Sequence, residues 1–557
     1  MHVVLRPDTH GVSVIPLTPN GVPGERMQTL ALSELPAIVA VLERESPTWV
    51  WDSTARWYPA LLESGVRVHR CVDLRLNHVI LRNSAHTISS RLATAPASAW
   101  DSAAPVVDTS DLVSGTLFDF EDLGESTLDP DPIAEFALQQ EAVAGSAASG
   151  SLRLLLAAES AGSLIAAEMR FAGLPWSVQR HSDLLTQMLG PRPRPGERPQ
   201  KLEQLLSQVR SALGVHDLNP DSPNDLLRAL RRAGLTIDST RSWDLKRLNH
   251  PVIAPLLEYK KLARLLAANG WVWVDTWVAD GRFRPDYVPG GVVTGRWATS
   301  GGGALQLPKQ IRGAVVPDPG WKLIVADAAQ LEPRILTGLS ADKRMAEAGR
   351  GDLYEGIVAS GAVSTRAEAK VAMLGAMYGA TSGDGGRLMP RLTRAFPQAI
   401  AVVEAAARVG ERGDIVSTRL GRSSPFPGEE WRELQERAYG PEAPEPLKRA
   451  AQMQARSWGR FTRNFVVQGT AAEWALCWMA GLRNRLWDLA DGSLTDKPHL
   501  VFFLHDEVMV HAPAHLADQV AEQIRAAAAD AGRLIFGQMP ITFPVTVAIV
   551  DSYADAK

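Results

Sequence analysis

Apolar residues form two short, nearly continuous runs that each lead to an acidic residue. In WKLIVADAAQLEPR an apolar run of strand length ends at Asp327, and a helix-like segment with Glu332 and Arg334 follows. In VFFLHDEVMVHA, Asp506 sits at the turn between two apolar runs, 179 residues after Asp327. Asp also favours ordinary turns, but the strongly apolar flanks speak against that reading. The pattern predicts two acids on buried strands, which suits a pair of metal ions.

A helical pattern lies between these two runs, in RAEAKVAMLGAMYG. Arg366, Lys370, Leu374 and Tyr378 are spaced by four residues and fall within an arc of about 120° on a helix. Such a face is more often an amphipathic surface than a binding site. Its position between two acid-bearing strands favours a site for a phosphorylated ligand.

The rest of the chain shows three patterns. Residues 1–100 alternate short apolar runs such as WVWDS and VILRN with a helix-like segment around YPALLES, which indicates a small α/β unit. Residues 101–151 are rich in Ser, Gly, Pro and Asp, which is typical of a linker or mobile surface loop. Residues 152–270 are mostly helical, with a break at 190–200 and a capping signal in LNPDSPNDLLRAL.

Composition adds few constraints. A chain of 557 residues with 45% hydrophobic residues can build about three or four domains. It has no apolar stretch of membrane-spanning length and no signal-like N-terminus, so we expect a cytoplasmic protein without a membrane partner. Cys71 and Cys477 are 406 positions apart, and we expect two reduced thiols with neither a disulfide nor a cysteine metal site.

The net charge of −4 is unevenly distributed. Residues 101–150 hold eleven acidic and no basic residues, so 58 basic residues face 51 acidic ones in the remainder. Affinity for a phosphate backbone depends on local clusters of Lys and Arg, and the whole-chain sum is therefore weak evidence for or against nucleic-acid binding.

The three central segments resemble motifs A, B and C of the family-A DNA polymerases, in the family's order and approximate spacing. LNPDSPNDLLRAL and EYKKLARLL look like the family's thumb helices. TGRWATSGGGALQLPKQIR is similar to its segment in the primer–template minor groove, and RFTRNFVVQGTAAE to its helix along template and primer. Each motif alone is weak, but five in the right order are specific.

The resemblance implies a fold. Residues 152–557 would form a mainly α right-hand polymerase domain, with the thumb at about 152–270 and a palm with an antiparallel sheet plus fingers at about 271–557. Residues 1–100 would form an α/β domain like a 3′→5′ exonuclease, and residues 101–151 an acidic linker.

The resemblance also implies a reaction: template-directed addition of dNTPs to a primer 3′-hydroxyl by two-metal phosphoryl transfer, with Mg²⁺ as the metal and Mn²⁺ as a substitute. Its metal ligands would be Asp327, Asp506 and the backbone carbonyl of Ala328. The neighbouring Glu507 is a further candidate metal ligand. Lys370 would protonate the leaving pyrophosphate.

Further residues would bind the nucleotide. Arg366 and Lys370 would hold the triphosphate, and Glu332 resembles the steric gate that excludes a 2′-hydroxyl. In isolation Glu332 would be a surface residue on the first turn of a helix. The rest of the nucleotide-binding set is Gln330, Tyr354, Leu374 near the sugar or base, and Tyr378 near the template base.

The DNA-binding set carried over from the family consists of Arg296, Gln306, Arg460, Asn464, Gln468 and, at the primer terminus, His505. Two positions of the nucleotide set depart from the family pattern. Tyr354 stands where many relatives have His, so triphosphate affinity would be lower, and Leu374 stands where Phe or Tyr is usual. Arg334 is expected to make a buried structural ion pair with a neighbouring acid.

The N-terminal region lacks most exonuclease acids. No D-x-E occurs in residues 1–100, and Arg56 or Trp57 falls near an expected aspartate. Asp119 and Glu121 form a D-x-E only within the acidic stretch, where a chance match is easy. We therefore expect no proofreading, and because the region before the polymerase-like part is short, we also expect no 5′-nuclease domain.

Two alternatives remain: a bifunctional exonuclease and polymerase, and a non-catalytic DNA-binding scaffold. The expected partners are primer–template DNA and dNTPs, and the expected state is a monomer associated with the nucleoid. A role in DNA replication or repair follows from the resemblance, which does not choose between them.

Overall fold

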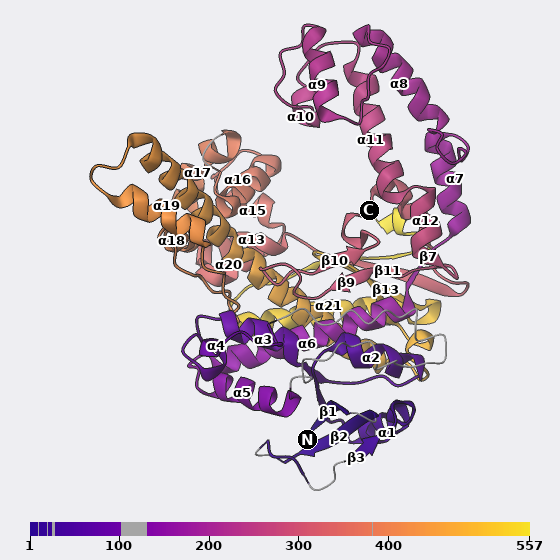
Figure 1. Cartoon of the computed structure of the whole chain (residues 1–557), viewed down its shortest axis with the longest axis vertical. Coiled ribbons are helices and arrows are strands. Elements are labelled where there is room, and N and C mark those ends of the chain that lie inside the picture. The colour runs from indigo at the N-terminus through magenta and orange to yellow at the C-terminus, as the bar shows by residue number, and fades with distance from the viewer. Residues whose placement is uncertain (9–10, 19–20, 25–27, 102–130, 381–382, 557) are drawn as a thin grey trace. The chain divides into compact units, whose positions relative to one another are not determined.

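The computed structural model describes residues 1–8, 11–18, 21–24, 28–101, 131–380 and 383–556 (Figure 1). The chain divides into two compact units. Unit 1 contains residues 1–172, 286–300 and 324–549, and unit 2 contains residues 173–285, 301–323 and 550–557. The first division falls at residue 172 and not at the expected residues 100 or 152, because the N-terminal region packs against later parts of unit 1.

The N-terminal region is an α/β structure, as predicted. Its sheet has the order β3-β2-β1-β4-β5, with β1 antiparallel to β2 and parallel to β4. The strands are β1 (His2–Asp8), β2 (Gly11–Leu17), β3 (Gln28–Leu30), β4 (Thr48–Trp51) and β5 (Cys71–Asp73). The helices are α1 (Leu35–Leu42), α2 (Thr54–Glu63), α3 (Leu74–Asn83) and α4 (Arg91–Thr94). The VILRN run lies in α3, so it is not a strand.

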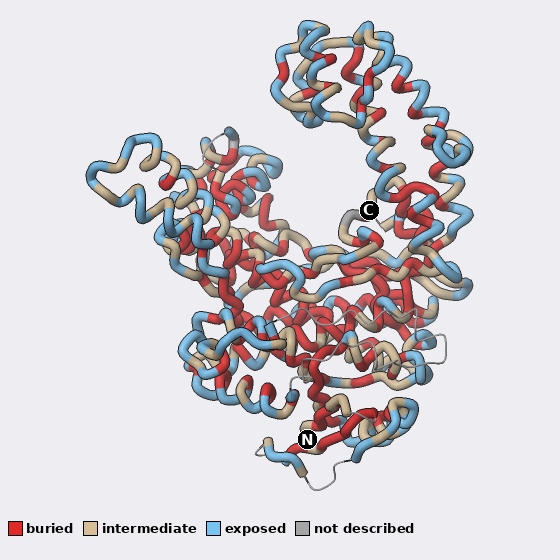
Figure 2. Tube along the Cα trace, viewed as in Figure 1, coloured by how far each residue is buried: buried red, intermediate tan, exposed pale blue. Residues whose placement is uncertain are grey.

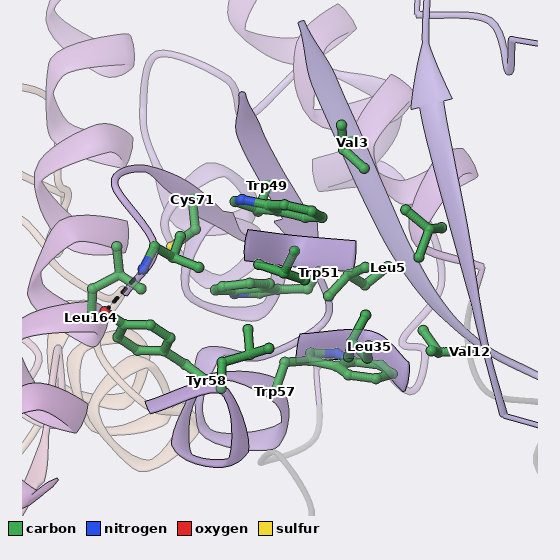
Figure 3. Close-up of a cluster of buried hydrophobic side chains, with 14 of the residues drawn as sticks. Val3, Leu5, Val12, Leu35, Trp49, Trp51, Trp57, Tyr58, Cys71 and Leu164 are labelled. Atoms are coloured by element: carbon green, nitrogen blue, oxygen red, sulfur yellow. Dashed lines mark hydrogen bonds between the residues drawn. The ribbon is translucent and has the colours of Figure 1, made fainter. Parts of the chain in front are cut away.

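Helix α6 (Ser149–Ala172) completes the core of this sheet. Trp49, Trp51 and Tyr58 are fully buried, and Leu164 of α6 belongs to the same cluster (Figure 3). The Thr54 hydroxyl lies 2.7 Å from the Ser163 hydroxyl of α6. The N-terminal region therefore shares its core with the rest of unit 1.

Part of the expected acidic linker is helical. Residues 102–130, with Asp119 and Glu121, lie outside the described residues, but α5 spans Pro132–Ala144 and α6 begins at Ser149. The Asp131 side chain caps α5 by accepting the Ile133 N–H, and Phe136 and Val143 are buried. The compositional argument missed α5 because a single apolar face on a short, acidic helix is a weak signal.

A four-stranded sheet in unit 1 has the order β12-β13-β11-β14. Its strands are β11 (Trp321–Ala328), β12 (His499–Leu504), β13 (Glu507–Pro513) and β14 (Val545–Val550). The pair β12–β13 is antiparallel, in agreement with the expected palm sheet. The remaining helices of unit 1 are α13 (Leu331–Ser340), α14 (Lys343–Ala348), α15 (Leu353–Ala359), α16 (Arg366–Tyr378), α17 (Gly383–Ala395), α18 (Pro397–Glu411), α19 (Glu429–Tyr439), α20 (Glu445–Trp487) and α21 (Ala517–Phe536).

Helix α20 crosses unit 1 and is buried along most of its second half (Figure 2). Its Arg483 donates to Glu168 of α6 and to the carbonyl of His69. The buried Cys477 lies on the same helix, and Cys71 lies on β5; both are free thiols, as expected.

Unit 2 is mainly helical, as predicted for residues 152–270, although α6 belongs to unit 1. Its elements are β6 (Leu174–Pro175), α7 (Val178–Leu189), α8 (Gln200–Leu213), α9 (Pro223–Arg232), α10 (Ser242–Leu245), α11 (Ile253–Asn269), α12 (Trp271–Trp277), β7 (Val278–Ala279) and β8 (Arg282–Phe283). The predicted break separates α7 from α8, and Ser222 caps α9 as the sequence indicates. No helix among the described residues is long and apolar enough to span a membrane.

Candidate active site

The two predicted acids lie on neighbouring strands. Asp327 is the next-to-last residue of β11, and Asp506 lies in the turn between β12 and β13. The Ala328 N–H donates a hydrogen bond of 2.9 Å to the Asp506 carbonyl. The turn is tight because His505 adopts a left-handed conformation, with φ of 59°. This main-chain contact brings the two acids together at one end of the sheet.

The donors at this point fit a magnesium site. Both aspartates are partly exposed, whereas Glu507 is 2% exposed and points into the protein interior. Mg²⁺ takes few protein ligands and keeps several waters, so two carboxylates are a sufficient set. No group of three or more His, Cys, Asp or Glu side chains with metal-site geometry occurs within the described ranges.

Helix α16 forms over the predicted residues and presents the predicted face. Arg366, Lys370, Leu374 and Tyr378 are all exposed, while Ala369, Ala372, Met373 and Ala376 are buried. Thr365 caps the helix by accepting the Glu368 N–H. The four-residue spacing thus separates a solvent-facing side of the helix from a packing side.

Arg366 is held by a residue that the motif comparison missed. Its Nη2 donates to Asp352 Oδ2 at 2.9 Å, and its guanidinium lies 5.4 Å from the centre of the Tyr354 ring. Asp352 also caps α15 by accepting the Glu355 N–H. Burial alone would raise the pKa of Asp352, but the hydrogen bonds from Arg366 and the α15 backbone hold it below its ordinary value. The D-x-x-E pattern at residues 352–355 was the available signal.

Burial also changes the phenols of this region. It raises the pKa of Tyr354 to about 12, so this side chain stays a neutral hydrogen-bond donor at physiological pH. Lys370, by contrast, is exposed and makes no ion pair or hydrogen bond with any described residue.

Glu332 on the first turn of α13 joins two parts of the site. Arg296 Nη2 donates to its Oε1 at 2.5 Å, and the Tyr378 hydroxyl lies 3.3 Å from its Oε2. Burial, then the nearby Glu332 charge, raises the pKa of Tyr378. Because 15% of its side chain is exposed, Glu332 is not the free surface residue that a helix start would suggest.

Arg334 is structural, as expected, but its partners are not. It donates five hydrogen bonds, to the carbonyls of Ala329, Gly349, Gly351 and Thr542 and to the side chain of Gln330. The expected ion pair with an acid is therefore wrong: the guanidinium binds main-chain oxygens left over at loops around α13. Gln330 in turn donates to Asp352, the carboxylate that also accepts from Arg366.

The expected DNA-binding residues on α20 share one side of that helix. Arg460 is exposed, and Asn464 and Gln468 are half-buried. The Thr294 hydroxyl donates to Gln468 Oε1 at 3.0 Å, close to Arg296 in the chain. Partial desolvation of the His505 ring, followed by the Arg296 charge, lowers its pKa. The Gln306 side chain lies outside the described residues.

Two acids of the N-terminal region, Asp52 and Asp73, accept hydrogen bonds from neighbouring protein groups. Asp52 accepts hydrogen bonds from Trp57 Nε1 at 2.6 Å and from Arg56 Nη1 at 3.1 Å. Asp73 accepts the Thr54 N–H at 2.8 Å and caps α3. Both acids therefore serve the packing of this region.

The chain resembles known proteins over most of its length. Residues 196–555 match the model of DNA polymerase family A. The thermostable DNA polymerase I of Thermus thermophilus is 25% identical over 394 residues, which cover 63% of this chain and 43% of that protein. The corresponding Thermus aquaticus enzyme is 25% identical over 392 residues, which cover 62% of this chain and 43% of that protein. The chain thus spans less than half the length of these relatives.

A solved structure shares the fold. It is the POL domain of Pol1 from M. smegmatis in complex with DNA primer-template and dNTP, with a TM-score of 0.69 and 18% identity. The match covers 100% of this chain and 95% of that chain. The N-terminal α/β region and the mainly helical remainder both belong to this fold.

Replacing Arg334 tests the structural reading of this side chain. Lys has three donors on one nitrogen and cannot reach four separated carbonyls, so we expect Arg334→Lys to lower the free energy of unfolding by about 3 kcal/mol. Arg350→Lys, at an exposed pair with Glu347, should change it by no more than about 0.5 kcal/mol. Urea unfolding of both variants measures this; equal stabilities would show that the carbonyl contacts are dispensable.

Proposed function

Because the chain belongs to DNA polymerase family A, we propose that it extends a primer 3′-hydroxyl with dNTPs under the direction of a template. The observation that carries the proposal is the junction of Asp327 and Asp506 through the Ala328–Asp506 hydrogen bond. Two aspartates at the ends of neighbouring strands, together with a helix face that carries two cations, match the needs of nucleotidyl transfer. The related Pol1 structure is a complex with DNA primer-template and dNTP, which supports the same substrates for this chain.

Asp327 and Asp506 would hold two Mg²⁺ ions, with the Ala328 carbonyl as a further ligand. When bound, the ions supply charge neutralisation at the attacking and leaving oxygens. Arg366 would bind the triphosphate after exchanging Asp352 for phosphate. This exchange costs little because nearly half of the Arg366 side chain is exposed. Lys370, without a described partner, would give the proton to the leaving pyrophosphate.

The residues around Glu332 would select and place the nucleotide. Glu332 would fill the space next to C2′ of the sugar, held there by Arg296 and Tyr378. Leu374 would contact the sugar or base, and Tyr378 would lie near the template base. Gln330 and Tyr354 would support this pocket through Asp352 and Arg366.

The primer and template would lie along α20 and the turn between β12 and β13. Arg460, Asn464 and Gln468 offer polar groups at spacings of four residues on one helix. His505 would touch the primer terminus from the strand turn. Arg296 and Gln306 complete the expected DNA-binding set. A cytoplasmic, nucleoid-associated monomer stays a prediction from the sequence.

We also propose that the N-terminal region does not proofread. The bifunctional alternative needs several carboxylates free to bind metal, but Asp52 and Asp73 are committed to protein donors. The scaffold alternative is disfavoured because both central aspartates and both α16 cations are retained and partly or fully exposed.

Removal of either central carboxylate should stop extension. We expect Asp327→Asn and Asp506→Asn each to lower the rate at least about 10²-fold while duplex binding stays intact, because the charge that stabilises the transition state is lost and the phosphate contacts remain. Asp518→Asn, an exposed acid on α21, is the control. Primer extension with Mg²⁺ and fluorescence anisotropy measure the two properties. Near-normal incorporation by either variant would contradict the two-metal assignment.

Sugar choice should depend on the bulk of Glu332. We expect Glu332→Ala to raise the ratio of ribonucleotide to deoxyribonucleotide efficiency, kcat/KM, by about tenfold or more, because it opens the space for a 2′-hydroxyl. Glu332→Gln keeps the volume and should retain most of the selectivity, and Glu347→Ala is an exposed control. An unchanged ratio in Glu332→Ala would remove Glu332 from the gate role.

A labelled primer with a mismatched end tests for proofreading. Incubated with Mg²⁺ or Mn²⁺ and no dNTP, it should keep its length, since the described part of residues 1–100 contains no group of three or more side chains that could hold a metal ion. The Asp506→Asn protein serves as background. Shortening that persists in that variant but disappears on Asp52→Asn or Asp73→Asn would show that the N-terminal region is an active exonuclease.

A further inference from the structure

A small hairpin at residues 417–423 packs against the turn that carries Arg296. The hairpin closes through a bridge between Ser417 and Ser423 and a hydrogen bond of 2.8 Å from the Thr418 N–H to the Arg422 carbonyl. We call it the 417–423 hairpin. None of its residues belongs to the motifs that the sequence singles out.

Buried groups from two distant segments anchor the 417–423 hairpin. Glu473 of α20 accepts the Leu420 N–H at 3.0 Å and is hydrogen-bonded to the Thr418 hydroxyl. The Ser84 hydroxyl, after α3, donates to the Gly421 carbonyl at 2.7 Å. The hairpin is therefore fixed to α20 and to the N-terminal region at once.

The hairpin ends in an ion pair that covers the Arg296 turn. Arg422 donates to Glu159 of α6, and their side chains are 10% and 1% exposed. A Cβ at Gly295 would lie 2.5 Å from Arg422 Nε, and Gly295 has φ of 83°. Only glycine fits under this guanidinium, so Arg422 holds the turn in place from above.

The hydrogen bonding of this buried ion pair is incomplete. Glu159 Oε2 and Arg422 Nε are buried and have no hydrogen-bond partner among the described residues. Burial raises the pKa of Glu159 even though Arg422 opposes the shift. A buried ion pair with unsatisfied atoms seldom repays its desolvation, and apolar replacements are often as stable. We therefore explain the Glu159–Arg422 ion pair by the turn at Gly295 that it holds in place.

The turn under Arg422 carries the partner of the sugar gate. It is closed by hydrogen bonds from the Gly295 N–H to the Val292 carbonyl and from the Val292 N–H to the Arg296 carbonyl. The same turn presents Thr294 to Gln468 and Arg296 to Glu332. A displacement of Gly295 would therefore move Arg296 away from Glu332.

We propose that Glu159 and Arg422 are positioning residues for sugar selection: the ion pair fixes the 292–296 turn, the turn fixes Arg296, and Arg296 fixes Glu332. This inference rests on the proposed polymerase function and on the gate role of Glu332. It assigns a part in substrate choice to α6, which contributes no residue to the predicted active site.

The test is the ratio of ribonucleotide to deoxyribonucleotide kcat/KM in the full chain. Glu159→Leu/Arg422→Ala removes both buried charges and the cover over Gly295, and we expect the ratio to rise about tenfold, mainly through a lower KM for the ribonucleotide. Glu159→Gln keeps an acceptor for Arg422 and should raise the ratio less. Glu168→Gln, at the buried pair with Arg483 on the same helix α6, should leave it unchanged.

The outcomes separate the two claims. The inference is overturned if the double variant has the unfolding temperature of the wild type and also its ratio of ribonucleotide to deoxyribonucleotide kcat/KM. Should the double variant not fold, a wild-type ratio in Glu159→Gln overturns it equally, provided that Glu332→Ala shifts the ratio. An unchanged ratio in Glu332→Ala itself instead refutes the gate assignment, whatever the pair does.

Discussion

The hydrogen bond from the Ala328 N–H to the Asp506 carbonyl is the contact on which the site depends. It sets β11 beside β13, so that two acids 179 residues apart meet at one end of a buried sheet. Side chains alternate along a strand, and a register shift of one residue would turn Asp327 toward the opposite face. The apolar runs before the two acids are buried along the strands, and the acids follow where each buried run ends.

Three arginines near this junction differ in how far they are buried and in what they bind. The Arg366–Asp352 pair is partly exposed, so breaking it costs little free energy. The Arg296–Glu332 pair is more buried. Arg334 binds carbonyl oxygens and is 2% exposed, which makes it part of the framework. Burial of the arginine thus increases from Arg366 through Arg296 to Arg334.

Local patterns predicted the parts of the site, and long-range contacts completed it. The strand before Asp327, the helix with Arg366 and the hairpin at Asp506 follow from periodicity within a dozen residues. The partners of Arg296 and Arg334 could not be predicted, because they come from segments tens to hundreds of residues away. Helix α5 was missed since its acidic composition resembles that of the preceding segment.

Direct counting of bound Mn²⁺ by electron paramagnetic resonance tests the central claim, that Asp327 and Asp506 form one metal site. The sample would contain the protein, a primer–template with a dideoxy end, and the matching dNTP, compared with nucleotide alone. If Asp327 and Asp506 form one metal site, the wild type binds two protein-dependent ions. We expect no protein-dependent Mn²⁺ ion for Asp327→Asn/Asp506→Asn, and two for Asp518→Asn. An undiminished count in the double variant would contradict this claim.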